Sequence, residues 1–143
     1  MGIAAAAAEA QTENVVPTVK HEMRTMKRAV ASENLKHAKV NTRAQARRDE
    51  PKFRALATTL DRAATVVSRS STDSATQRRG RHDWVLAVRG VVKGYRQFDY
   101  ALSDIAHGRQ DAAKREALRA EGTVLRAAKT LVTADKLLKI RSS

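Results

Sequence analysis

The stretch from residue 84 to residue 105 carries bulky apolar side chains at alternating spacings of four and three residues. These positions are Trp84, Val88, Val91, Tyr95, Phe98, Leu102 and Ile105. Such spacing places all of them on one face of an α-helix, and an apolar face of this length has to be buried against other helices. Four of the five aromatic residues of the chain fall in this stretch. The pattern therefore predicts an all-α protein with this helix at its structural centre.

Three further segments have helical patterns, and together they predict one antiparallel bundle of three to four helices in a single domain, residues 17–143. We expect helices over about residues 18–48, 50–69, 73–106 and 111–140. A chain of 143 residues is long enough to bury such a core without metals or disulfides. The first of these helices is long and basic and has the poorest apolar face, so we expect it to lie along the core of the other three or to project from it.

The element boundaries rest on local signals. The Asp49-Glu50-Pro51 sequence predicts a helix start there, because a capping Asp, an acidic first turn and an early proline all favour a helix N-terminus. The third helix begins either near residue 73 or only at Asp83, after a basic loop.

Two further signals mark the end of the third predicted helix and the start of the predicted domain. The His107-Gly108 pair is typical of a helix C-terminus. Residues 1–16 are Ala-rich and net acidic and end in Val-Val-Pro. We interpret them as a short arm that is flexible or becomes ordered on a partner.

The two last predicted helices also carry packing signals. Apolar residues of the last helix cover a face wider than a two-helix contact needs, which predicts two neighbours. Gly90 and Gly94 each cost about 1 kcal/mol relative to alanine inside a helix. Their spacing predicts a close approach of the Ala-rich last helix, or alternatively of a partner backbone.

The charge of the chain limits its partners. There are 28 Lys and Arg residues against 15 Asp and Glu, a net charge of +13, and the excess is largest in residues 17–48. Two trios in that segment repeat every four residues and so form basic ridges on a helix surface. They are Lys20, Arg24 and Arg28, and Lys39, Arg43 and Arg47.

Two smaller basic groups accompany these ridges. They are Arg78, Arg79 and Arg81, and Lys136, Lys139 and Arg141. Clustered Lys and Arg bind polyanions by releasing counterions, with contacts to phosphates that do not depend on base sequence. All twelve residues are therefore predicted to contact a polyanion, most simply nucleic acid. The competing interpretation is a solvated basic surface without a ligand.

Catalytic and metal-binding patterns are missing from the sequence. There is no cysteine, and no nucleophile elbow, phosphate-cradling glycine loop or HExxH motif. Glu33 and His37 lie one helical turn apart, but the other histidines have no ligand spacing to them. We interpret this pair as a polar contact that fixes helix register. The prediction is a protein that is not an enzyme, with no cofactor and no metal.

A second class of function stays open. The arm and the basic helix could pack on neighbouring subunits, which would make the chain a structural or assembly protein of a virion or another multi-subunit particle. A peripheral binder of anionic membranes is a third possibility, but the basic helix offers few bulky apolar residues for it.

The sequence also bears on location. No run of about 20 apolar residues could cross a bilayer. The apolar start of the chain lacks the basic residues of a signal or transit peptide. We expect a cytoplasmic protein or one inside an intracellular or virion particle.

Overall fold

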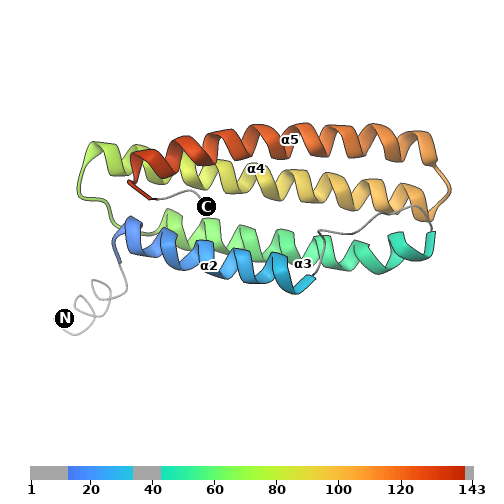
Figure 1. Cartoon of the computed structure of the whole chain (residues 1–143), viewed down its shortest axis with the longest axis horizontal. Coiled ribbons are helices and arrows are strands. Elements are labelled where there is room, and N and C mark those ends of the chain that lie inside the picture. The colour runs from blue at the N-terminus through green and yellow to red at the C-terminus, as the bar shows by residue number, and fades with distance from the viewer. Residues whose placement is uncertain (1–12, 34–42, 141–143) are drawn as a thin grey trace, which may run out of the picture.

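The structure is a computed structural model that describes residues 13–33 and 43–140. These residues form four helices, and consecutive helices run in opposite directions along a bundle (Figure 1). The helices are α2 (Val15–Glu33), α3 (Arg43–Ser68), α4 (Ala75–Ala106) and α5 (Gln110–Leu137). Within the described residues the only β-type pairing is a single bridge between Asn14 and Ser71. The predicted all-α antiparallel bundle is confirmed.

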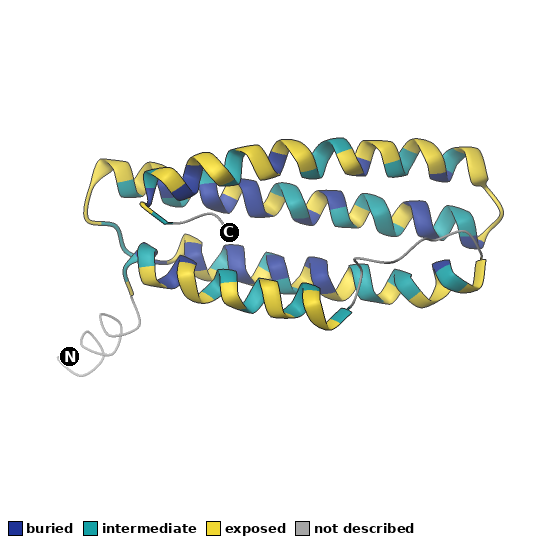
Figure 2. Cartoon of the chain, in the orientation of Figure 1, coloured by how far each residue is buried: buried dark blue, intermediate teal, exposed yellow. Residues whose placement is uncertain are grey.

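The apolar core lies where the four helices converge, and buried residues face the interior of the bundle (Figure 2). Trp84, Val88 and Leu102 on the predicted apolar face of α4 are buried, and its other members are half-buried. Val15 and Val19 of α2 are also fully buried and belong to the same cluster as Trp84. The first half of α2 is therefore part of the core, a larger share than its weak apolar pattern predicts.

The start of α2 corrects the predicted boundary of the arm. Asn14 accepts a hydrogen bond from Val16 N at 3.0 Å through its side chain, and Val15 N donates to Ser71 O at 2.8 Å. Pro17 stands in the first turn, where its missing N–H breaks no helical hydrogen bond. Residues 14–16 thus belong to the folded domain and not to the arm. Residues 1–12 lie outside the described part of the chain.

The predicted helix boundary at residues 49–51 is wrong. Helix α3 begins at Arg43 and contains Pro51, so residues 43–48 belong to it and not to the preceding helix, which ends at Glu33. The physical reason is burial upstream of the proline: Ala46 is fully buried in a small cluster with Leu102 and Ala106 of α4. Burial of this turn holds it in the helix despite Pro51, which removes one helical hydrogen bond; Pro51 is exposed, so water can solvate the carbonyl oxygen that loses its partner.

The structure shows which of the two predicted starting points of the third predicted helix, here α4, is correct. Ser74 is the N-cap, and its hydroxyl accepts a hydrogen bond from Gln77 N at 3.1 Å. Arg78, Arg79 and Arg81 therefore lie in the first turns of α4, and the basic-loop interpretation is wrong. Gly80 is buried rather than a break in the helix, because a Cβ there would lie 2.6 Å from Cδ2 of Leu138.

Helices α4 and α5 end in the same hydrogen-bonded motif. After α4, Arg109 N donates to Asp104 O and Gly108 N donates to Ile105 O, with Gly108 at φ 76°. This confirms the predicted His107-Gly108 stop. After α5, Ile140 N donates to Asp135 O, and Lys139 takes the left-handed position at φ 55°. Helix α5 therefore ends at Leu137, before the predicted residue 140.

Helices α4 and α5 approach closely through small residues. In α4, Gly80, Ala87, Gly94 and Ala101 are buried, and in α5, Ala113, Ala120, Ala127 and Ala134 are buried, each set at intervals of seven. A Cβ on Gly94 would clash with Cγ2 of Val124, and one on Gly90 would lie 3.0 Å from Cβ of Ala127. The prediction that the two glycines admit the last helix is confirmed.

Candidate polyanion-binding surface

Helix α2 presents the first predicted ridge intact. Lys20, Arg24 and Arg28 are exposed and follow one another at one-turn intervals along the helix. None of the three side chains forms an ion pair or hydrogen bond with another residue of the described ranges. Their charges are therefore not neutralised by the described part of the chain.

The second predicted ridge is not a continuation of the first. Arg43 and Arg47 are exposed on the first turns of α3, at the end of the bundle where α4 connects to α5 (Figure 1). The guanidinium of Arg43 lies over this connection, since a Cβ on Gly108 would be 2.6 Å from Nη2 of Arg43. Lys39 lies outside the described residues. The expectation of one long basic helix with two ridges is thus replaced by two basic regions on different helices.

A third basic region lies at the opposite end of the bundle, where α4 starts and α5 ends. The contact between Gly80 and Leu138 shows that these termini are neighbours. The region contains the exposed residues Arg78, Arg79, Lys136 and Lys139. Arg141 is outside the described residues. The structure thus brings together two basic groups that are about 60 residues apart in the sequence.

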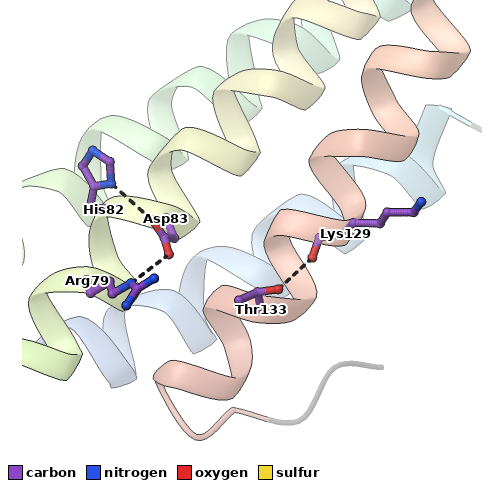
Figure 3. Close-up of polar contacts among 5 residues, drawn as sticks. All are labelled: Arg79, His82, Asp83, Lys129 and Thr133. Atoms are coloured by element: carbon purple, nitrogen blue, oxygen red, sulfur yellow. Dashed lines mark hydrogen bonds and ion pairs between the residues drawn. The ribbon is translucent and has the colours of Figure 1, made fainter.

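Two arginines of this region already have partners within the bundle. The Nε atom of Arg79 lies 4.0 Å from Oδ2 of Asp83 (Figure 3). The other carboxylate oxygen of Asp83, Oδ1, lies 3.3 Å from Nδ1 of His82. Arg81 is half-buried and donates a hydrogen bond to the carbonyl oxygen of Ser70. Arg81 therefore joins α4 to the end of α3, which leaves it less available to a ligand than Arg78.

The exposed surface of α5 adds cations that the sequence analysis did not single out. Lys129 is exposed, and its side chain extends away from α4 (Figure 3), while its carbonyl oxygen accepts a hydrogen bond from Thr133 at 3.3 Å. Arg126 is exposed one turn earlier. In contrast, Arg119 forms an ion pair with Glu116 at 3.2 Å.

The structure also contains a hollow of about 430 Å³ along α4, bordered by α3. Its lining includes three cations and an exposed phenol from α4 and one carboxylate from α3. They are Arg89, Lys93, Arg96, Tyr100 and Asp61. The three cations follow the helical spacing of i, i+4 and i+7, which is the signal by which the sequence could have revealed this group. These residues alternate with core positions of α4, so the group does not stand out in the sequence.

Tyr95 and Asp99 have shifted pKa values, and both lie between α3 and α4. Burial raises the pKa of Tyr95, whose ring packs edge-on against Phe53 at 5.8 Å. Burial also raises the pKa of Asp99, an effect that the nearby Arg54 opposes and that Glu50 strengthens. The Nε atom of Arg54 lies 3.4 Å from Asp99 Oδ2. Both shifts arise mainly from burial between the packed helices.

Comparisons with known proteins give no further guide to function. No protein-family model matches the chain, and no curated protein or solved structure matches it either. Within the described ranges, no three His, Asp or Glu side chains are grouped so that they could hold a metal ion. Among the helices of those ranges, none is both long and apolar enough to span a bilayer.

Proposed function

We propose that the protein is a non-catalytic binding protein whose basic helical surface docks on a polyanion, and that this polyanion is nucleic acid. The observation that carries the proposal is the ridge of Lys20, Arg24 and Arg28 on α2, exposed and without acidic partners among the described residues. Like charges at this spacing repel by a few tenths of a kcal/mol per pair. A row of phosphates relieves that repulsion, and the release of its counterions drives binding.

The ligand is expected to be bound through its backbone and not read by sequence. Lysine and arginine on a convex helix surface reach phosphate oxygens, which are the same at every base pair. Arg78, Lys136 and Lys139 at one end of the bundle, and Arg47 at the other, extend the basic surface beyond α2. Binding is thus expected to weaken steeply with salt and to vary little among sequences.

The experiment compares two double variants of equal charge by fluorescence anisotropy. The probe is a labelled random-sequence duplex, titrated between 50 and 200 mM salt. Arg24→Ala with Arg28→Ala should lower the slope of log affinity against log salt by about 1.8, since each lost phosphate contact removes about 0.9. The control, Lys52→Ala with Arg119→Ala, removes two cations that pair with Asp49 and Glu116, and should keep more of the wild-type slope.

Two results would contradict the proposal at different levels. Equal slopes for the two double variants would remove the α2 ridge from the binding surface. Absence of duplex and single-strand binding by the wild-type protein at 50 mM salt would exclude nucleic acid as the ligand.

A second candidate function is assembly with protein neighbours, and one feature of α5 favours it. Leu118, Leu125 and Val132 recur every seven residues and are 69%, 58% and 43% exposed. The sequence predicts two neighbours for α5, but α4 is the only described helix that forms an extensive interface with it. A row of exposed apolar residues along one helix is typical of a helix-helix contact.

Sedimentation over a range of concentrations separates this candidate from nucleic-acid binding. Assembly predicts concentration-dependent self-association, or a stable complex with a protein partner, that Leu118→Ser with Leu125→Ser abolishes. Nucleic-acid binding predicts that the same variant keeps its affinity for the duplex. A wild-type protein that stays monomeric and binds the duplex would favour the first proposal over the second.

A further inference from the structure

The hollow on α4 combines positive charge with an exposed aromatic ring. Arg89, Lys93 and Arg96 line it, and none of them has an ion pair within the described residues. Tyr100 lies one turn beyond Arg96 on the same wall and is 62% exposed. Every other aromatic residue of the described chain is buried or half-buried. Among the Phe, Tyr and Trp rings of the described chain, Tyr100 is thus the one that is exposed to a ligand.

The geometry matches the requirements for binding a single strand. From Arg89 to Tyr100 the helix rises about 16 Å, so the cations and the ring form one continuous track. Proteins that bind single strands combine a basic groove along the backbone with aromatic rings on which bases stack. Bases of a duplex are stacked on one another and leave no face for Tyr100, whereas those of a single strand do.

The hollow also offers a polar group for a base edge. The side-chain amide of Gln97 lines it, and the Oε1 atom of Gln97 is buried without a hydrogen-bond partner in the described structure. This oxygen is enclosed, so the amide offers a base only its N–H donors, which pair with acceptor atoms on a base edge. Asp61 is the single carboxylate of the lining and is outnumbered by the three cations.

We infer that this hollow binds single-stranded nucleic acid, with Arg89, Lys93 and Arg96 on the phosphates and Tyr100 stacked on a base. The inference rests on the proposed function and narrows it, because it names the form of nucleic acid that this surface prefers. An acidic peptide would use the cations alone and would gain nothing from the phenol ring. That difference makes Tyr100 the residue to test.

The experiment measures binding of a labelled 12-nucleotide oligothymidylate and of a 12-base-pair duplex to full-length protein at 50 mM salt. Tyr100→Ala should weaken binding of the oligothymidylate by about 5-fold to 150-fold, the range that corresponds to one lost stacking contact. It should change duplex binding by less than about twofold. Tyr100→Phe keeps the ring and should bind both probes like the wild type.

A charge control accompanies these variants. Arg96→Ala removes a cation of the hollow and should lower the salt slope for the oligothymidylate by about 0.7. Arg119→Ala removes an exposed cation of α5 that lies outside the hollow and pairs with Glu116, and it should leave that slope unchanged. Helical circular dichroism of each variant checks that the fold is retained.

The outcomes separate the inference from the proposed function. If Tyr100→Ala leaves oligothymidylate binding within twofold, or weakens both probes equally, the hollow is not a stacking site, although nucleic-acid binding stands. Equal effects of Arg96→Ala and Arg119→Ala would also overturn the inference. If wild-type protein binds neither probe, the inference and the proposed function both fail.

Discussion

Helix α4 packs on its two neighbours in opposite ways. Toward α5 it presents small residues at intervals of seven, such as Gly80 and Gly94, and the two backbones come close together. Toward α3 it presents large residues, and the ring of Phe53 lies 5.6 Å from that of Phe98 and 5.8 Å from that of Tyr95. One interface is therefore filled by backbone and the other by side chains.

The difference shows which substitutions each interface can accept. A large side chain that is cut back leaves a cavity, whereas a small one that is enlarged meets atoms that cannot move away. The interface with α3 should thus be sensitive to loss of volume and the interface with α5 to gain of volume. Stability measurements on single variants can confirm or break this contrast.

The largest effect is expected at Trp84, which is fully buried in the cluster shared by all four helices. Trp84→Ala should lower the free energy of unfolding by about 3–5 kcal/mol through the cavity it leaves. Trp84→Phe should cost less, because it removes fewer atoms and the indole Nε1 has no hydrogen-bond partner in the described structure. Urea unfolding followed by circular dichroism measures both, and equal losses would contradict the cavity explanation.

A smaller effect of opposite origin is expected at Gly94. Gly94→Ala places a methyl group against Val124 and 3.3 Å from the carbonyl oxygen of Ala120. We expect a loss of about 1–3 kcal/mol from overpacking, reduced by the better helix propensity of alanine, which is worth up to about 1 kcal/mol.

Gly122 provides the matched control for that variant. It lies within α5, and the nearest atom to a Cβ there is the end of the Arg126 side chain at 3.5 Å. Gly122→Ala should therefore stabilise the protein by up to about 1 kcal/mol. A thermal melt of both variants checks the sign, and a stabilising Gly94→Ala would show that α4 and α5 are not in close contact.

The smallest effect is expected at Asp99, on the side of α4 that faces α3. Its raised pKa means that the folded state holds the proton to higher pH than the unfolded state. Stability therefore falls as pH rises from the usual Asp pKa through the raised value. Asp99→Asn should unfold at a slightly higher temperature than the wild type at pH 7, and this advantage should disappear below about pH 3.8.

Asp99→Asn also loses the ion pair with Arg54, but this loss reduces the expected rise in unfolding temperature only weakly. The Arg54 side chain is 59% exposed, and such pairs contribute about 0–1 kcal/mol. Thermal melts at pH 7 and at pH 3.5 test the prediction. A lower melting temperature for Asp99→Asn at pH 7 would show that the ion pair outweighs the burial of the carboxylate.

Helix boundaries show where sequence reasoning reached its limit. The combination of a capping residue and an early proline occurs at residues 14–17 and again at 49–51. The first does start a helix, with Asn14 as its cap, whereas the second lies inside α3. The local patterns are alike, so the outcome depends on burial of Ala46 against α4, which no local pattern contains.

The candidate site was predictable in kind but not in arrangement. The one-turn spacing of Lys20, Arg24 and Arg28 is enough to place them on one face of α2, and the structure does so. Arg43 and Arg47, predicted for the same helix, lie on α3 instead. The hollow around Tyr100 combines residues of α4 with one of α3, so it exists only after the helices have packed.

By itself the sequence determined the helical class, the apolar face of α4, the close approach at Gly90 and Gly94, and the excess of positive charge. These follow from periodicity and composition, which are properties of the chain before it folds. Only the tertiary structure decided where α3 begins, how far α2 enters the core and which cations share a surface. Those features depend on contacts between segments distant in the sequence, and the free energy of burying them outweighs local preferences.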